Sequence, residues 1–160
     1  MKDLEALFKH FLRDMYYAEN KILKTLPGMA KKADSPELRQ AIEHHQKETE
    51  QQIANLEKVF AMLDLKPSGV TCEAINGILE ESKEIMKEAG DPDTCDAGMI
   101  AAAQAVEHYE ITRYGTMVSW AGTLGLKDAA RLLQQNLDQE YAADNKLTKI
   151  AEGSLNRQAA

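Results

Sequence analysis

The chain of 160 residues lacks the marks of a secreted or membrane-spanning protein. It has only two cysteines, Cys72 and Cys95, and no Cys-x-x-Cys pair, which excludes a dense disulfide scaffold and favours a reducing compartment. Charged residues interrupt the apolar N-terminus, and no apolar run is long enough to cross a bilayer. We therefore expect a cytoplasmic protein with neither a signal peptide nor a membrane span.

Positive charge is also scarce. The 19 Lys and Arg residues are outnumbered by 26 Asp and Glu, which gives a net charge of −7. Without a basic run, the chain is not expected to bind nucleic acid or an anionic membrane surface. Aromatic residues make up only 6% of the chain, and no strand-like alternation of apolar and polar residues is present, so the sequence favours helix over sheet.

What the sequence does contain is apolar residues at helical spacing. They predict four long helices, over about residues 2–33, 36–63, 95–121 and 127–152, and a shorter helix over about 73–89. Pro27 and Gly28 are expected to kink the first helix or end it early, and Asp34 with Glu37 has the spacing of a capping box. Gly153 is expected to stop the last helix, leaving residues 154–160 as a frayed polar tail.

The lengths of the connections predict the topology. Two hairpins of long helices are separated by residues 64–94, a segment long enough to return along the whole bundle. This arrangement is the single long crossover of ferritin-like bundles. The predicted fold is therefore an all-α, ferritin-like four-helix bundle, formed by one domain over residues 1–153, with a short extra helix in its crossover.

Polar residues interrupt the apolar stripe of every long helix near its middle. They are Glu19 in the first helix, His45 with Glu48 at the edge of the stripe in the second, Glu107 and Glu110 in the third, and Glu140 and Asp144 in the last. Buried carboxylates without partners are unfavourable, and the stripes contain almost no Lys or Arg to pair with them. Divalent metals bind carboxylate oxygen and imidazole nitrogen, so the pattern predicts a dinuclear metal site inside the bundle.

The two hairpins resemble each other around these positions. Glu19 and Glu48 in the first hairpin correspond to Glu110 and Glu140 in the second, which gives a pseudo-symmetric set of four. His45, Glu107 and Asp144 then add ligands, or partners that orient ligands through hydrogen bonds. For some of these residues a simpler interpretation stays open, because Glu48 at the edge of its face is also consistent with a solvated acid, and His45 with a hydrogen-bonded core histidine.

Four segments of the sequence resemble a known family. LRDMYYAENKILKTLP, HHQKETEQQIANLEKVF, AAAQAVEHYEITRYGT and LDQEYAADNKL are similar to the bacterial YciE/YciF family of ferritin-like proteins, and nearest to its YciF branch. The similarity covers nearly the whole chain. It implies a ferritin-like bundle, a stress-associated cytoplasmic role, a homodimer, and two iron or manganese ions held by Glu19, Glu48, Glu110 and Glu140. It does not imply a settled reaction.

The sequence departs from the wider pattern of di-iron bundles, which supply Glu-x-x-His from two helices. The corresponding slots here read Glu48-x-x-Gln51 and Glu140-x-x-Ala143. An oxygen-rich site shifts the expected metal towards manganese, or towards a weakly held ion.

Two hypotheses for the function follow. The first is a di-metal oxidoreductase that acts with oxygen or peroxide, as in iron oxidation or peroxide disproportionation, and the second is a non-catalytic metal-binding or structural stress protein. In a third, the acids stay protonated or hydrated in a metal-free scaffold.

Overall fold

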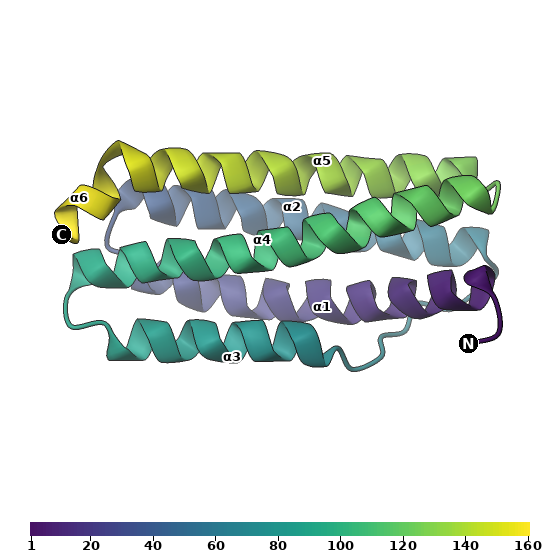
Figure 1. The fold of residues 1–160 in the computed structure, drawn as a ribbon, viewed down its shortest axis with the longest axis horizontal. Helices are drawn as coiled ribbons and strands as arrows, with labels where there is room; N and C mark the ends of the chain where they lie inside the picture. Colours follow the sequence, from purple (N-terminus) through teal and green to yellow (C-terminus); the bar gives the residue numbers. More distant parts are fainter.

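The computed structural model describes residues 1–160 and has four long helices lying side by side (Figure 1). They are α1 (Leu4–Lys32), α2 (Pro36–Met62), α4 (Pro92–Thr123) and α5 (Lys127–Ile150). The shorter α3 (Glu73–Glu88) lies outside this group, against α4 and α1. The predicted all-α bundle is confirmed. None of its helices combines the length and apolar character that a bilayer crossing requires.

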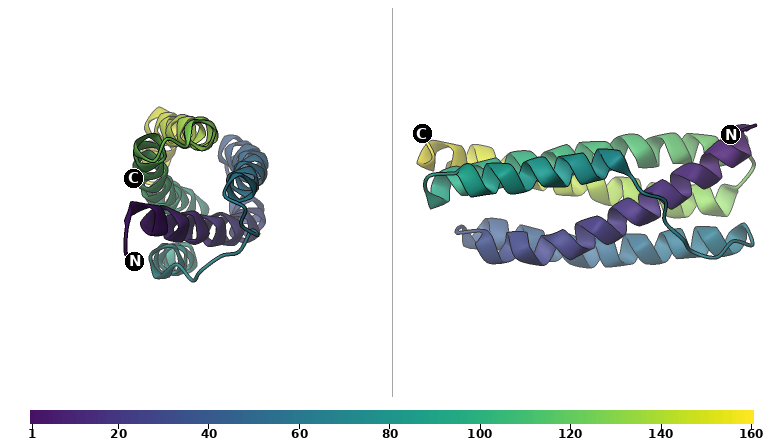
Figure 2. Two further views of the ribbon diagram at one scale, coloured as in Figure 1. Left: turned by 90° about the vertical axis from the view of Figure 1, so that its right-hand side faces the viewer. Right: turned by 90° about the horizontal axis from the view of Figure 1, so that it is seen from below.

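The order of the helices gives the predicted single crossover. Helices α1 and α2 form one hairpin, α4 and α5 form the other, and the segment with α3 returns along the bundle between them (Figure 1). Figure 2 shows α1 inclined across the other helices. All four long helices are amphipathic or apolar over their middle turns, so each turns a buried stripe towards the common core.

Contacts far apart in sequence fix the crossover. The Tyr17 hydroxyl donates to Asn76 Oδ1 at 3.0 Å, and Cys72 Sγ lies 2.9 Å from the Tyr109 hydroxyl. Gly69 passes so close to α1 that a Cβ there would lie 2.9 Å from Tyr17 Cβ and 3.2 Å from Tyr17 Cα. This close approach requires glycine. It holds α3 against the bundle beside the polar core residues described below.

The start of α2 differs from the predicted capping box. Its cap is Ser35, whose hydroxyl accepts from the Leu38 N–H at 3.4 Å, so the predicted pairing of Asp34 with Glu37 is wrong by one residue. The reason is Asp96 on α4. Its carboxylate accepts from the Asp34 N–H at 3.0 Å and the Ser35 N–H at 2.7 Å, which fixes the connection between α1 and α2.

Pro27 and Pro92 lie in long helices. Helix α1 continues through Pro27 to Lys32, so Pro27 does not end it early, and the turn after Pro27 buries Met29 in the core. Pro92 is the first residue of α4, a position where a helix has no use for the missing N–H. Asp91 caps that helix, so α4 starts three residues before the predicted Cys95.

The C-terminal segment is also more ordered than the sequence indicates. After Ile150 the backbone forms a π turn over Ala151–Leu155 and a last short helix, α6 (Asn156–Gln158). Gly153 lies inside the π turn and does not end the helical segment. Leu155 is only 4% exposed, and its burial holds the segment against the start of α4.

The core consists of one cluster of 34 buried apolar residues. Its largest fully buried side chains include Phe8, Phe60, Leu12 and Met117, and burial of each stabilises the fold by about 1.5–3 kcal/mol relative to an exposed position. Near the middle of the bundle this cluster is interrupted by buried polar residues. They are Glu19, His45, Thr49, Gln52, Asn55, Glu107, Glu110, Asn136 and Glu140.

Candidate metal centre

Three acidic side chains from two helices and a histidine from a third meet in the interior. His45 on α2, Glu107 and Glu110 on α4, and Glu140 on α5 each place one ligand atom so that all four atoms lie within 4.8 Å of one another. Glu107 and Glu110 share a face of α4 because they are three residues apart. The carboxylates are at most 2% exposed and the imidazole is 7% exposed, so water does not solvate the group.

Glu19 reaches the same region from α1. It is fully buried, and it accepts a hydrogen bond from the Tyr114 hydroxyl through one oxygen. Its own charge acts on Glu110, and Glu140 acts on it. With Glu19, every long helix of the bundle contributes a carboxylate or an imidazole to the centre, as the interrupted stripes predict.

Most of the oxygen and nitrogen atoms in this group that could bind a metal lack hydrogen-bond partners. Both oxygens of Glu110, both ring nitrogens of His45, and one oxygen each of Glu19, Glu107 and Glu140 have none. His45 Nε2 lies 3.3 Å from Glu107 Oε1 but is not aligned for a hydrogen bond. No Lys or Arg forms an ion pair with any of these carboxylates. Buried polar atoms are rarely left unpaired, so this set requires an explanation.

The electrostatics follow from the same geometry. Burial, with the charge of Glu140, raises the pKa of Glu19 to about 8, and burial raises the pKa of Glu107 to about 7. Burial and neighbouring carboxylates hold the pKa of Glu110 and of Glu140 well above the usual range. A metal-free site therefore holds protons at neutral pH, because its acids face one another without a cation.

His45 is the only group of the cluster that can carry positive charge. Burial alone would lower its pKa, but the contact with Glu48 and the charges of Glu140 and Glu19 outweigh burial and raise the pKa. One imidazolium still balances only one of four carboxylates. The remainder must be protonated or must bind a cation.

Two predicted site residues, Glu48 and Asp144, lie at the edge of the cluster and outside the group of four. Their side chains are each 19% exposed. Glu48 lies 3.3 Å from His44 Nε2 and 3.7 Å from His45 Nδ1. The pKa of Glu48 is lowered, because the effect of these two histidines outweighs that of burial, which alone would raise it. The carboxylate set implied by the resemblance, with Glu48 as a member, therefore differs from the group that converges, in which His45 and Glu107 take part.

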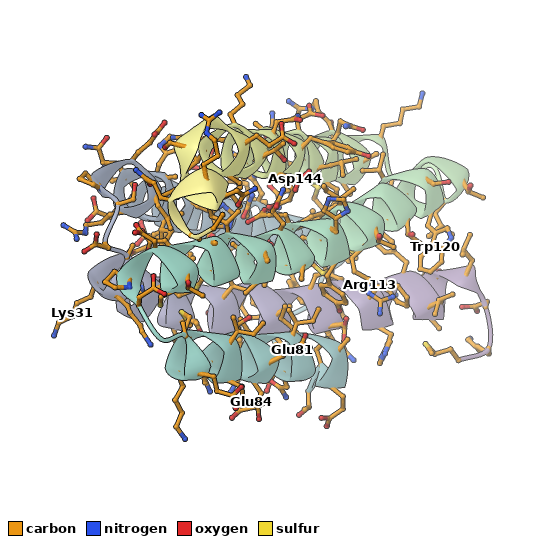
Figure 3. The ribbon with its side chains drawn as sticks, turned by 60° about the vertical axis from the view of Figure 1, so that its left-hand side comes forward. Lys31, Glu81, Glu84, Arg113, Trp120 and Asp144 are labelled. Atoms are coloured by element: carbon orange, nitrogen blue, oxygen red, sulfur yellow. The ribbon has the colours of Figure 1, made fainter.

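Asp144 has partners of its own on α4. It accepts a hydrogen bond from Gln104 Nε2 at 3.0 Å and lies 3.2 Å from His108 Nε2. Figure 3 shows Asp144 where side chains gather between α5 and α4. His44 and His108 are exposed, as the sequence indicates, yet each approaches one of these two acids. The edge acids are thus suited to orienting histidines.

Sequence reasoning missed two side chains that hold the cluster. Gln52 Nε2 donates to Glu140, and the Tyr114 hydroxyl donates to Glu19. Both residues lie on the apolar stripe of their helix, since Gln52 follows the buried Thr49 by three residues and Tyr114 follows Glu110 by four. Helical spacing therefore predicts that both side chains point inward. Which acid each one contacts depends on the packing of α2 against α5 and of α1 against α4.

A second polar layer lies beside the acids and is internally satisfied. Asn55 Nδ2 donates to Asn136 Oδ1 at 2.8 Å, and Asn136 Nδ2 donates to the Gln52 carbonyl at 3.3 Å. Gln51 Nε2 donates to Asn55 Oδ1 at 3.2 Å. This amide layer, formed by Asn55 and Asn136, joins α2 to α5 without any ligand.

Known proteins share both the sequence and the fold. Residues 3–160 match the family described as Domain of unknown function (DUF892). Protein YciF of Escherichia coli K12 is 39% identical over 160 residues, covering 99% of this chain and 96% of YciF. The crystal structure of that protein, described as a stress protein, superposes with a TM-score of 0.93 over 98% of this chain and 99% of YciF.

Two further structures are similar. YcfI from Rhodopseudomonas palustris, for which a structural role has been suggested, is 48% identical with a TM-score of 0.91, covering 92% of this chain and 94% of YcfI. A protein from Xanthomonas campestris is 26% identical with a TM-score of 0.70, covering 98% of this chain and 99% of that protein. The predicted resemblance to YciF is confirmed, and the chain belongs to the DUF892 family.

Proposed function

We propose that the protein binds a dinuclear iron or manganese centre inside its bundle and acts in redox chemistry with oxygen or peroxide under stress. The observation that supports this proposal is the convergence of His45, Glu107, Glu110 and Glu140, with Glu19 beside them, and most of their ligand atoms have no hydrogen-bond partner. The donor set fits such metals, since carboxylate oxygen suits manganese and imidazole nitrogen suits iron as well.

The residues would divide between two ions. His45, Glu107, Glu110 and Glu140 already lie within reach of a single ion. Glu19, on the remaining helix, has a free oxygen and is electrostatically coupled to Glu110 and Glu140, so it would complete a second position with them. Shared carboxylates would then neutralise the acids that otherwise repel one another.

The surrounding residues prepare the donors. Gln52 and Tyr114 each occupy one oxygen of Glu140 and Glu19, which leaves the other oxygen of each free. Glu48 lies beside His45 Nδ1, so that Nε2 turns towards Glu107. Partners of this kind fix the direction of a ligand and keep its charge in place.

Iron or manganese bound here would supply electron exchange with oxygen or peroxide, which no side chain of the cluster supplies. The side chains of the cluster would exclude water from the ions, because the four glutamates are only 0–2% exposed. When metal is absent, the same side chains hold protons. A role under stress agrees with the description of YciF as a stress protein.

A non-catalytic role is the second candidate, and the structural role suggested for the similar YcfI favours it. In that case metal would stabilise the bundle without turnover. Optical spectra recorded during addition of peroxide and then of reductant separate the two, because reversible spectral change requires a redox-active ion and a purely structural ion gives none.

Metal content tests the proposal directly. Untagged protein purified from its native host should contain about two Fe or Mn per chain by elemental mass spectrometry if acids bridge two ions as in di-metal bundles. Glu19→Gln with Glu110→Gln removes one ligand from each hairpin while keeping side-chain shape. The matched control is Glu43→Gln with Glu50→Gln, which removes the same charge from exposed positions of α2.

The expected result is full metal in the wild type and in the control, and loss in the Glu19/Glu110 variant. Metal-free wild-type protein that also takes up neither Fe nor Mn anaerobically would overturn the proposal. Metal retained in the Glu19/Glu110 variant would show that these acids are not ligands.

A further inference from the structure

A cavity of about 120 Å³ lies beside the candidate metal centre. All five main helices line it, and eleven of its eighteen lining residues are hydrophobic, so most of its wall can only contact apolar atoms. Its outer rim, between α2 and α5, includes the exposed His44 and Lys146. Its inner end lies under α3, at Leu79 and Ser82.

The cavity is distinct from the metal centre. Of the five cluster residues, only His45 and Glu107 line it, whereas Glu19, Glu110 and Glu140 do not. It is therefore more than the space that an ion would fill. Ala143 on α5 contributes to the opening because it stands three after Glu140, where many di-metal bundles carry a histidine, and its methyl group leaves the space free.

The inner wall offers little to water. Ile22, Leu26 and Met29 from α1 form one side of it. The two hydroxyls at the wall use their hydrogen within their own helices, since Thr25 donates to the Lys21 carbonyl at 3.0 Å and Ser82 to the Ile78 carbonyl at 2.7 Å. Partners for water are therefore confined to the side of His45, Glu48 and Glu107, and the rest of the wall resembles the apolar cavities of about 150 Å³ that bind benzene.

Helix α3 makes the cavity a closed space at this end. It turns Leu79 and Ser82 inward, while Glu81 and Glu84 on the same helix are exposed, and Figure 3 shows Glu84 on the outer side of α3. The four long helices contact one another without α3. Helix α3 thus covers a space that would otherwise be open between α1 and α4.

We propose that this cavity binds one small uncharged apolar molecule, about the size of benzene, next to His45 and Glu107. A charged molecule is disfavoured because the apolar wall cannot replace its hydration, and an anion would also meet Glu48 and Glu107. The consequence for chemistry rests on the proposed function, since the ligand would lie beside the metal centre. Binding itself requires only the cavity and is tested on metal-free protein.

The first measurement uses benzene as the probe and protein labelled with ¹³C in the methionine methyl groups. Met29 lines the cavity, whereas Met117 is buried elsewhere and Met62 is exposed. Benzene should shift the Met29 methyl signal saturably through its ring current and leave the other two unchanged. A Met29 signal that benzene does not move overturns the proposal.

Two variants fill the cavity from different helices, Ala103→Leu on α4 and Ala143→Leu on α5. Either should weaken benzene binding about tenfold or more, because the larger side chain takes up the volume. The matched control is Ala105→Leu, an exposed position on α4 that does not line the cavity. An unchanged Met117 signal shows that each variant is folded, and wild-type affinity in both folded cavity variants would overturn the proposal.

A second arm separates this proposal from the metal site. In wild-type protein loaded with Mn²⁺, bound benzene should show strongly enhanced proton relaxation, and Glu19→Gln with Glu110→Gln should abolish the enhancement but keep the Met29 shift. A saturable Met29 shift without relaxation enhancement upholds the cavity as a binding site and counts against manganese beside it.

Discussion

Two buried polar layers cross this bundle side by side, and they differ in one respect. In the amide layer, Asn55 Nδ2 donates to Asn136 Oδ1 and Asn136 Nδ2 donates to the Gln52 carbonyl, so their hydrogen-bonding capacity is largely used. In the acid layer, which comprises Glu19, Glu107, Glu110 and Glu140 with His45, both oxygens of Glu110 have no partner at all. Gln52 belongs to both, since its backbone accepts from Asn136 while its side chain donates to Glu140.

The comparison shows which buried polar groups point to a ligand. Burial is nearly complete in both layers, so burial alone does not distinguish them. The amide layer needs no ligand, because its hydrogen bonds link α2 to α5 and each one adds the usual modest contribution to the free energy of unfolding. The acid layer is not explained by the fold, because its atoms are left without partners and its charges repel.

The largest expected effect is the pH dependence of the metal-free protein. The pKa of Glu19, about 8, and of Glu107, about 7, lie above the 4.5 of an unperturbed glutamate. Above pH 4.5 the native chain therefore holds more protons than the unfolded chain, and the free energy of unfolding falls as pH rises through both folded values. The slope is about 1.4 kcal/mol per pH unit for each extra proton.

Denaturant unfolding of metal-free protein between pH 5 and pH 8 measures this slope. His45, whose pKa is also raised, acts in the same direction, while Glu48, whose pKa is lowered, acts only as the pH falls below 4.5. Bound metal should reverse the trend, because ligands must lose protons to bind it. A metal-free protein with constant stability over this range would contradict the arrangement of the acid layer.

The next effect concerns the amide layer. Asn136→Leu leaves the buried Asn55 Nδ2 without its acceptor, which should lower the free energy of unfolding by about 1–3 kcal/mol. Metal content should stay that of the wild type. Adding Asn55→Leu should recover part of the loss, since removing both partners is milder than removing one. Loss of metal in Asn136→Leu would mean that the two layers are not independent.

A smaller effect of opposite sign is expected in the acid layer. Glu140→Gln removes one of the mutually repelling carboxylates, so at pH 8 the metal-free protein should become more stable, by about 1 kcal/mol or somewhat more. The same substitution should abolish metal uptake. Thermal unfolding with and without Mn²⁺ measures both, and a metal-free Glu140→Gln protein that is less stable than wild type would show that the acids do not strain the fold.

Much of this arrangement was predictable because helical spacing fixes direction. Glu19, Glu107, Glu110 and Glu140 all have apolar neighbours three or four residues away on both sides, and all four are buried. The crossover was predictable from chain length. The inward direction of these four side chains follows from spacing within one helix.

What depended on contacts between helices was not predictable. Helical spacing placed Glu48 at the edge of its face, but only the assembly of all four helices brings His45 Nε2 to within 3.3 Å of Glu107 Oε1. The cap at Ser35 depends on Asp96, 61 residues away. The π turn after Ile150 is held by the burial of Leu155 against another element.

The last prediction tests the edge of the acid layer, where metal affinity should weaken without being lost. Glu48→Gln keeps the shape of the side chain but removes the charge beside His45 Nδ1, so the imidazole loses the partner that orients it. Metal affinity should fall about 10- to 100-fold, the usual result of changing a residue that orients a ligand. Titration with Mn²⁺, beside Glu50→Gln at an exposed position two residues on, measures the change. If Glu48 were itself a ligand, as the carboxylate set implied by the resemblance requires, uptake would be lost outright, as for Glu140→Gln. An unchanged affinity would place Glu48 with the solvated acids and leave the five interior residues to hold the metal alone.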